Sequence, residues 1–232
     1  MEDYLISNIE GSNGSLSDSN ADNRTLLLSV SGTIDLSNLD VKLNPFIVLQ
    51  STQYTNLSNN SPFNIRLLAE NGEILSVYPF APKLDTIPVD SRNKPALISE
   101  AVPYINGTKK IVLSKDGLEL ASRFVSAHAP EVNILSPSGG EFFNSSITIL
   151  WNAKDLDGDT LTYFLFYSND GGRTWQSIGS NIQNTTKLQV DLETLPGSTV
   201  YSSLFRIFAS DGINTALDDS NPFIIPKRIH DH

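Results

Sequence analysis

Alternating aspartates in the stretch KDLDGDTL, residues 154–161, are the side chains in this sequence best suited to chemistry. Asp155, Asp157 and Asp159 offer carboxylate oxygens at every second position, and Gly158 permits a tight bend among them. Oxygen ligands with this spacing suit a hard cation such as Ca²⁺. The stretch is not an EF-hand loop, because its glycine comes two positions early, no Glu stands at the twelfth position, and strands rather than helices are expected on both sides.

Asp211 is a fourth candidate ligand, in the stretch SDGINTALDDSNP, which also holds Asp218 and Asp219. In a seven-strand sandwich the loop between the second and third strands and the loop between the sixth and seventh lie at the same end. Asp211 is therefore expected to face the alternating aspartates, where like charges repel unless a cation or Lys154 intervenes. The alternative is a set of solvated turns, with Asp155 and Asp211 bonded to local backbone. Both interpretations stay open, and Ca²⁺ is the cofactor that the sequence suggests.

A second cluster has the pattern Ser-x-Asp-x-Gly-x-Thr-Trp and consists of Ser168, Asp170, Gly172, Thr174 and Trp175. This pattern resembles the Asp box of sialidases and other propeller glycosidases, where it recurs once per blade on turns away from the catalytic centre. The present sequence has one copy. A carboxylate that accepts backbone N–H groups, next to glycines and above a packed tryptophan, makes a stable turn. We therefore interpret the box as a structural hairpin turn.

Recognised catalytic constellations are missing from the sequence. His128 has no nucleophile motif near it, and His230 and His232 lie at the C-terminus. There is no Gly-x-Ser-x-Gly, no His-Glu-x-x-His and no phosphate-binding glycine loop. Cysteine is absent, which removes disulfides and thiolate metal sites. We predict that the chain is not an enzyme.

Composition narrows the classes of partner and the location. The net charge is −10, from 26 acidic and 16 basic residues, so nucleic acid, which is bound through Lys and Arg, is not an expected partner. Apolar runs stop far short of the roughly 18 residues of a membrane span, so no direct membrane insertion is expected. Met1 is followed by Glu2 and Asp3 rather than by a signal peptide. We interpret the chain as a piece of a longer extracellular or cell-surface protein.

Strands are the elements that must position these residues. A length of 232 residues suits two domains of about 100 residues each. The dipeptides Asn71-Gly72 and Asp116-Gly117 tolerate the positive φ that hairpin turns demand, and Pro130 interrupts any ladder at the start of the second half. We predict a flexible tail at residues 1–24, a β-sandwich domain at 25–129, a second β-sandwich at 130–226, and a disordered tail at 227–232.

The second half reads as seven short strands with turns between them, which is typical of an immunoglobulin-like sandwich. The strands are expected at residues 132–135, 146–153, 161–168, 174–178, 186–192, 202–210 and 222–226. Through ITILWNA with Trp151, LTYFLFYS and LFRIFASDG, residues 130–226 resemble a fibronectin type III domain. They are more narrowly similar to modules of secreted prokaryotic proteins, including peptidases, that carry S-P-x-G-G-E, W-x-A-x-D-x-D-G-D-x-L-T-Y and S-x-D-G-G-x-T-W. The resemblance implies an all-β chain of two tandem β-sandwich domains.

Strict alternation divides residues 161–168 into two faces. The longer set is assigned to the core, and the neighbouring strand is expected to add residues to the same side. The core set is Leu161, Tyr163, Leu165, Tyr167, Phe205, Ile207 and Ala209. The outward set is Phe164, Phe166, Leu204, Arg206 and Phe208. An outward apolar patch marks a contact surface, so we expect this set to be buried against a loop, the N-terminal domain or a separate partner.

Two functions fit this architecture. The first is a non-catalytic accessory or adhesive module pair of a secreted or cell-surface protein, which serves as a rigid spacer or protein-interaction unit. Its partners would be other domains of the parent protein, a surface protein or a glycan. The second is a carbohydrate-binding module attached to a glycosidase or peptidase, although Tyr54, Tyr104 and Tyr201, the candidate sugar platforms, are not grouped in the sequence.

Overall fold

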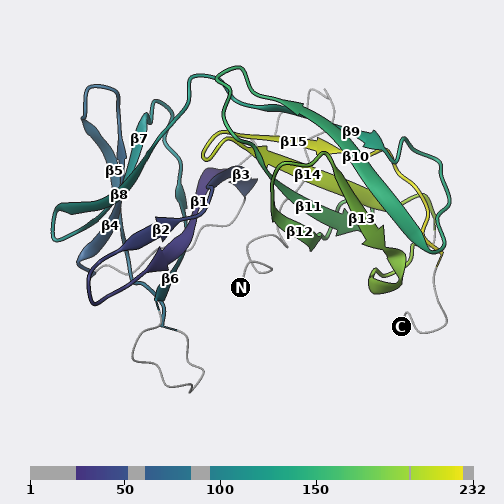
Figure 1. Ribbon diagram of the computed structural model, residues 1–232, viewed down its shortest axis with the longest axis horizontal. Helices are drawn as coiled ribbons and strands as arrows, with labels where there is room; N and C mark the ends of the chain where they lie inside the picture. The colour runs from purple at the N-terminus through teal and green to yellow at the C-terminus, as the bar shows by residue number, and fades with distance from the viewer. Residues whose placement is uncertain (1–24, 52–60, 85–94, 199, 227–232) are drawn as a thin grey trace, which may run out of the picture. The chain divides into compact units, whose positions relative to one another are not determined.

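The computed structural model in Figure 1 describes residues 25–51, 61–84, 95–198 and 200–226. These residues form two compact units. The N-terminal unit contains residues 25–127 with the short segment Gly212–Asn214, and the remaining described residues from His128 onward make the C-terminal unit. Every regular element in the described residues is a β-strand, apart from the 3₁₀ turn Leu192–Thr194. The predicted all-β class is therefore confirmed, while the predicted tails at 1–24 and 227–232 lie outside the described residues.

The N-terminal unit is a sandwich of two antiparallel sheets (Figure 1). In the first sheet β1 is central, with β6 along one side and β2 and β3 paired to successive parts of the other. The second sheet has the order β5-β4-β7-β8. The strands are β1 (Thr25–Ile34), β2 (Val41–Leu43), β3 (Ile47–Ser51), β4 (Phe63–Leu68), β5 (Ile74–Phe80), β6 (Ala96–Pro103), β7 (Lys110–Lys115) and β8 (Leu118–Phe124).

Alternating side chains from both sheets build the core of this unit. Leu28 and Val30 of β1 are completely buried, as are Ile65 and Leu67 of β4 and Ile111 of β7. The two predicted hairpins are present as β4–β5 and β7–β8. Their turns use positive φ at Gly72 and at the pair Asp116-Gly117, as the sequence predicts.

Glu100 interrupts the core-facing row of β6. It lies between Ile98 and Val102, opposite Val30 in the register, and only 8% of it is exposed. Burial raises the pKa of Glu100, and the positive charge of Lys83 opposes that rise only in part. The ionised carboxylate is therefore less favourable in the folded protein than in the unfolded chain.

We expect Glu100→Gln to raise the free energy of unfolding at pH 7. Because the pKa of Glu100 is raised on folding, the wild-type penalty is absent below the unfolded value of 4.5 and grows as pH rises through the folded pKa. The gain should thus disappear in acid when urea unfolding is compared across pH. Glu119→Gln is the matched control, because hydrogen bonds from Ser122 and Lys110 lower the pKa of Glu119, so this change should lower stability at pH 7 instead. Equal effects of Glu100→Gln at pH 4 and pH 7 would contradict the prediction.

The C-terminal unit pairs a three-stranded sheet, β13-β10-β9, with a four-stranded sheet, β12-β11-β14-β15. The four-stranded sheet has the same strand order as the β5-β4-β7-β8 sheet of the N-terminal unit. The other sheets of the two units differ, because β9, the first strand of the C-terminal unit, lies at an edge, whereas β1 is central in its sheet. This is the A-B-E and C′-C-F-G order of fibronectin type III domains, so the predicted fold of this half is confirmed. Its strands are β9 (Glu131–Ser136), β10 (Ser146–Lys154), β11 (Thr162–Ser168), β12 (Gln176–Ile182), β13 (Lys187–Asp191), β14 (Leu204–Ser210) and β15 (Thr215–Asp219).

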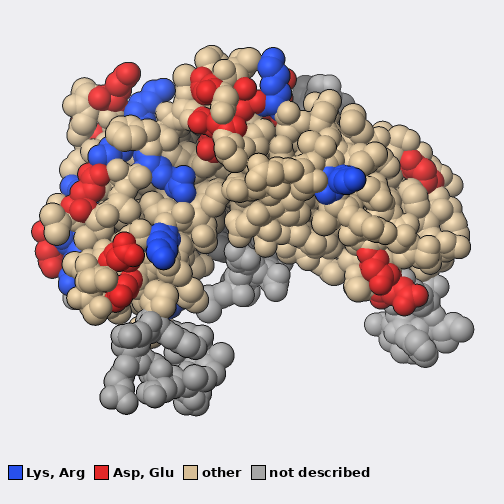
Figure 2. Space-filling view, in the orientation of Figure 1, with Lys and Arg blue, Asp and Glu red and all other residues tan. Residues whose placement is uncertain are grey.

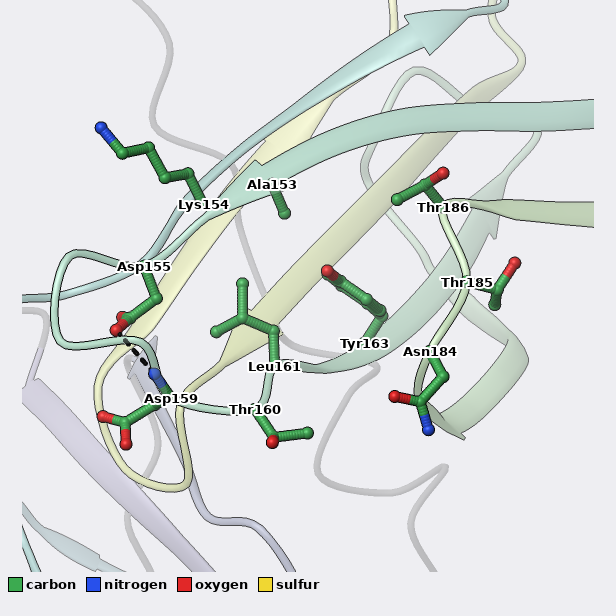
Figure 3. Close-up of a pocket in the computed structure, with 10 residues that line it drawn as sticks. All are labelled: Ala153, Lys154, Asp155, Asp159, Thr160, Leu161, Tyr163, Asn184, Thr185 and Thr186. Carbon is green, nitrogen blue, oxygen red and sulfur yellow. Dashed lines mark hydrogen bonds between the residues drawn. The ribbon is translucent and has the colours of Figure 1, made fainter.

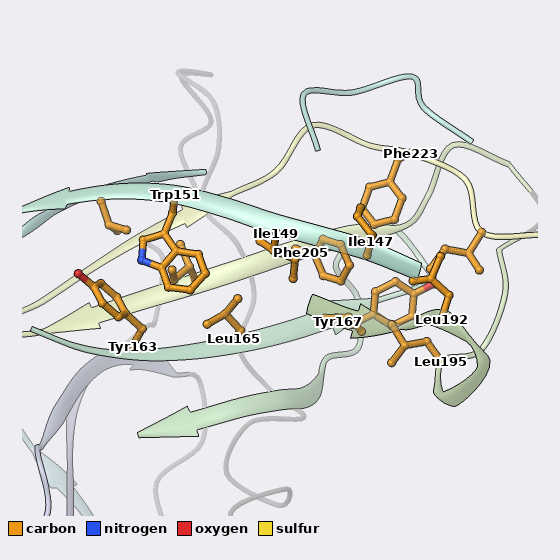
Figure 4. Close-up of a cluster of buried hydrophobic side chains, with 14 of the residues drawn as sticks. Ile147, Ile149, Trp151, Tyr163, Leu165, Tyr167, Leu192, Leu195, Phe205 and Phe223 are labelled. Carbon is orange, nitrogen blue, oxygen red and sulfur yellow. The ribbon is translucent and has the colours of Figure 1, made fainter. Parts of the chain in front are cut away.

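Aromatic side chains pack among aliphatic ones in the core between these sheets (Figure 4). Trp151 of β10 packs edge-on against Tyr163 of β11, with ring centroids 5.2 Å apart. Tyr167, which is 1% exposed, donates its hydroxyl to the carbonyl of Pro196 at 2.8 Å. The predicted inward face is confirmed, because the interior cluster contains Tyr163, Leu165, Tyr167, Phe205, Ile207 and Ala209, with Leu161 packed against it.

The last strand differs from the prediction. Residues 222–226 were expected to form it, but β15 occupies Thr215–Asp219 and pairs with β14 directly after a short turn. The later segment makes single bridges, from Phe223 to Ser203 and from Ile224 to Phe142. Its prolines at both ends lack the N–H that a continuous ladder requires, which explains why the ladder forms earlier.

Candidate functional site

The three alternating aspartates come together in the loop between β10 and β11 (Figure 3). Carboxylate oxygens of Asp155, Asp157 and Asp159 all lie within 4.8 Å of one another. Asp155 Oδ1 accepts the backbone N–H groups of Asp157 at 2.9 Å and Asp159 at 3.2 Å. Asp155 Oδ2 is buried without a hydrogen-bond partner among the described residues. The loop therefore combines the local turn bonding of the solvated-turn interpretation with a spare oxygen that a cation could use.

His128 holds the middle aspartate. Its backbone N–H donates to Asp157 Oδ2 at 2.7 Å, and its Nδ1 lies 2.7 Å from Asp157 Oδ1. The two residues are 29 positions apart, so no local sequence pattern indicates this contact. Any cation bound by Asp157 would share that carboxylate with His128.

The wider convergence of aspartates expected at this end is not seen for Asp218 and Asp219. In the part of the chain that the structure describes, Asp211 is not a member of the three-carboxylate group. Asp218 accepts the N–H of Ile134 at 2.7 Å, and Asp219 pairs with Arg206. Asp218 and Asp219 lie on β15 rather than in a loop, and successive residues of a strand point to opposite faces of the sheet.

An open pocket of about 450 Å³ adjoins the loop (Figure 3). Its lining is mostly polar and includes Asp155, Asp159, Asn184 and Thr186, with Tyr163 at its inner side. Burial raises the pKa of Tyr163, and the indole N–H of Trp151, which faces the phenol without hydrogen-bond geometry, offsets this in part. The pocket offers hydroxyl, amide and carboxylate groups to a small polar ligand.

The Asp box forms a closed hydrogen-bonded turn between β11 and β12. The carboxylate of Asp170 accepts from Ser168 Oγ at 2.7 Å, from the N–H groups of Arg173 and Thr174 at 3.0 and 2.9 Å, and from Thr174 Oγ1 at 2.7 Å. Trp175 donates its Nε1–H to the carbonyl of Gly172 at 2.9 Å. Gly172 has φ of 86°, and a Cβ there would lie 3.3 Å from the Trp175 ring, so the turn requires glycine.

We expect Asp170→Ala to lower the free energy of unfolding by about 1–2 kcal/mol through lost turn hydrogen bonds. Burial acts to raise the pKa of Asp170, but the bonds from Thr174, Ser168 and Arg173 outweigh it, so the pKa is lowered. The contribution of Asp170 is therefore present above the unfolded value of 3.8 and is lost as pH falls through the folded pKa. Chemical denaturation at pH 7 and in acid checks both points. An unchanged stability at pH 7 would contradict the structural role.

A third motif acid closes a turn in the same way. Glu141, the last residue of the S-P-x-G-G-E motif, accepts the N–H and Oγ–H of Ser138 at 2.7 and 2.8 Å and the N–H of Gly139 at 2.7 Å. Glu141, Asp155 and Asp170 thus each accept bonds from nearby backbone N–H groups. The most conspicuous acids of the sequence stabilise turns.

The predicted outward set lies on the face of the β12-β11-β14-β15 sheet opposite the core. We call Phe164, Phe166, Arg206 and Phe208 the outer aromatic face; they are 8%, 3%, 1% and 2% exposed, and the fifth predicted residue, Leu204, is partly buried. The Arg206 guanidinium lies 4.2 Å from the centroid of the Trp175 ring. Its Nε donates to Asp219 Oδ1 at 2.6 Å. The Phe166 and Phe208 rings meet edge to face at 5.6 Å.

Comparisons with known proteins supply little beyond this geometry. No family model and no curated protein matches the chain. One solved structure with some similarity is described as "Structures of Clostridium thermocellum CbhA fibronectin(III)-like modules"; it is 14% identical, and the match covers 80% of this chain and 87% of that chain with a TM-score of 0.32. A TM-score of that size establishes no common fold. Among the described residues, no helix has the length and hydropathy of a membrane span.

The strand order itself therefore defines the class of protein. The described chain is a tandem β-sandwich protein, and its C-terminal unit has the architecture of a fibronectin type III module.

Proposed function

We propose that the chain is a non-catalytic accessory or adhesive module pair of a larger secreted or cell-surface protein, in which it serves as a spacer or protein-interaction unit. The observation that carries the proposal is that the acids of the three sequence motifs stabilise turns. Glu141, Asp155 and Asp170 each accept backbone N–H groups of their own turns. A general acid or base must instead reach a reacting proton, and its pKa is tuned toward the working pH. The lowered pKa of Asp170 and of Glu141 favours turn stabilisation over acid catalysis.

A paired assay tests this function. The purified chain should produce no turnover on panels of glycoside and peptide substrates, while the same sample is screened for binding to glycans and to extracellular surface proteins. Turnover that Asp155→Asn or Asp170→Asn abolishes, in a variant that remains folded, would contradict the non-catalytic proposal. Binding to a surface protein without turnover would support it.

Carbohydrate binding is the second candidate, and the polar pocket beside Tyr163 favours it. The hydroxyl, amide and carboxylate groups that line the pocket are those that hydrogen-bond sugars, and an adjoining aromatic ring is common in such sites. A glycan array separates the two functions. Binding that Asn184→Ala abolishes, and that Thr148→Ala on the outward side of β10 leaves intact, would favour the carbohydrate-binding function. An array without specific binding favours the first.

The same proposal includes a Ca²⁺ ion in the loop between β10 and β11. Its support is the three carboxylates within 4.8 Å of one another and the spare Asp155 Oδ2. A cation that binds only the folded state adds about 2.7 kcal/mol at a hundredfold excess over its dissociation constant. We therefore expect a higher melting temperature in millimolar Ca²⁺ than in chelator.

A pair of variants makes the calcium experiment specific. Asp157→Asn should abolish the calcium-dependent shift in melting temperature. Asp116→Asn, which changes an acid in the β7–β8 turn of the other unit, should leave it unchanged. Identical melting temperatures of the wild-type chain in calcium and in chelator would rule out the site.

A further inference from the structure

Two aromatic residues in the core of the C-terminal unit carry polar groups that the core does not satisfy. Trp151 and Tyr163 are 2% and 6% exposed. Among the described residues, the indole N–H of Trp151 has no acceptor and the hydroxyl of Tyr163 donates to none. The hydroxyl of Tyr167, on the same strand, instead donates to the carbonyl of Pro196. Because a buried polar group without a partner costs free energy, the arrangement at Tyr163 suggests a ligand rather than packing alone.

The Tyr163 hydroxyl lies at the inner side of the polar pocket beside the aspartate loop. The pocket has a volume of about 450 Å³, and all of its lining residues belong to the C-terminal unit. In Figure 3 the phenol oxygen points toward the space between the labelled lining residues. The indole N–H of Trp151 faces the same oxygen from the core side (Figure 4). The hydrogen of the hydroxyl is therefore left for an acceptor that enters the pocket.

Backbone hydrogen bonds hold the walls of this pocket in place. The N–H of Trp151 donates to the carbonyl of Thr186 at 3.1 Å, which ties the chain before β13 to β10. On the other wall, the N–H of Asp159 donates to Asp155 Oδ1 at 3.2 Å. Asn184 has a φ of 55°, in the left-handed region that Asn adopts more readily than most residues. A pocket with walls already fixed loses little conformational entropy when a ligand binds.

The charges of the lining favour an uncharged ligand. Asp155 and Asp159 contribute carboxylates, and Lys154 is the one basic residue among those that line the pocket. Lys154 is exposed at the end of β10, and in Figure 3 its ammonium group points away from the other lining side chains. A ligand with a carboxylate or sulfate group would thus meet like charges without a facing cation. The hydroxyl and amide groups of the lining suit the hydroxyl groups of a ligand.

We propose that this pocket binds a sugar unit of a neutral glycan and that Tyr163 determines its specificity by donating its hydroxyl to a sugar oxygen. This inference rests on the carbohydrate-binding candidate above, and it adds the charge of the ligand and the residue that selects it. The ring of Tyr163 is too deeply buried to offer a stacking face, so hydrogen bonds carry the recognition. A site built to bond a ligand oxygen rejects ligands without it, because its own polar group then stays unpaired.

A pair of conservative variants on β11 tests the role of Tyr163. Tyr163→Phe removes the hydroxyl and keeps the buried ring. It should bind the strongest neutral glycan of the array, titrated in soluble form, roughly tenfold more weakly than the wild-type chain does. Its melting temperature should stay unchanged, because the hydroxyl has no acceptor to lose. Tyr167→Phe is the matched control, since it loses the bond to the Pro196 carbonyl; it should melt earlier and bind the glycan as tightly as the wild-type chain does.

The glycan array itself tests the charge of the ligand. In chelator, which leaves the carboxylates of the loop without a cation, the wild-type chain should bind neutral glycans in preference to glycans with carboxylate or sulfate groups. A preference for the acidic glycans would overturn the proposal, and this comparison decides it even if Tyr163→Phe fails to fold.

The outcomes also separate this inference from the function on which it rests. Neutral-glycan binding that Asn184→Ala abolishes and Tyr163→Phe leaves intact would overturn the inference and keep the carbohydrate-binding function. An array without specific binding would overturn both.

Discussion

Asp219→Ala should lower the free energy of unfolding by about 3–5 kcal/mol, because it removes the carboxylate that accepts two hydrogen bonds from a buried cation. Arg206 is 1% exposed, and its guanidinium donates to Asp219 through Nε at 2.6 Å and through a terminal nitrogen at 2.7 Å. The ring of Trp175 beneath the guanidinium contributes a cation–π attraction, but it cannot accept those two hydrogen bonds. Urea unfolding followed by tryptophan fluorescence measures the loss.

Two further variants isolate the cause. The double change of Arg206→Met with Asp219→Ala should recover most of the stability, because the buried charge is gone and methionine fills similar volume. Glu119→Ala breaks the exposed pair with Lys110 and should cost no more than about 1 kcal/mol. A loss from Asp219→Ala as small as the loss from Glu119→Ala would show that Arg206 finds water or another partner.

Trp151→Ala should cost about 3–5 kcal/mol, the range for removal of a large aromatic side chain from a core. Trp151 is 2% exposed, and it stands between the two sheets of the C-terminal unit against the ring of Tyr163 (Figure 4). Its loss would leave a cavity bordered by residues of both sheets. Thermal unfolding of the variant, compared with that of the wild-type chain, checks the magnitude.

Two smaller substitutions on β10 test whether the loss of stability comes from the buried indole ring. Trp151→Phe keeps an aromatic ring and removes a buried indole N–H that has no hydrogen-bond partner among the described residues, so it should cost clearly less than Trp151→Ala. Leu150→Ala, one position away and 39% exposed on the opposite face, should change stability by no more than about 0.5 kcal/mol. Equal losses from Leu150→Ala and Trp151→Ala would mean that the inward and outward faces of β10 have been exchanged.

Acidic side chains outnumber basic ones in this chain, and only some of the acids have a defined structural role. Acidic side chains are spread over both units in the visible face of Figure 2, with no broad basic surface beside them. The expectation that nucleic acid is not a partner rests on the excess of 26 acidic over 16 basic residues and stays a prediction. The acids with a defined role are those whose hydrogen bonds are set by a turn or by a buried partner.

Much of the fold was predictable because its signals are local. The period of two divides β11 into two faces, and the longer set, which starts at Leu161, indicated the inward one. The dipeptides Asn71-Gly72 and Asp116-Gly117 mark two hairpins, and both kinds of signal depend only on neighbours in the sequence. The turn chemistry of the Asp box is local in the same sense, because its bonds join residues at most four positions apart. The grouping of Asp155, Asp157 and Asp159 follows from their spacing within one loop.

Local sequence signals were therefore enough to predict the all-β class, the inward faces and the turns. The position of the last strand, the contact of His128 with Asp157 and the pairing of Arg206 with Asp219 became visible in the folded chain alone. Asp219 was expected in a loop. It pairs with Arg206 because β15 lies earlier in the sequence than predicted and places the two residues opposite each other in the register. Such contacts depend on which strands pair and in what register, and those choices minimise the free energy of the whole sandwich rather than of any local segment.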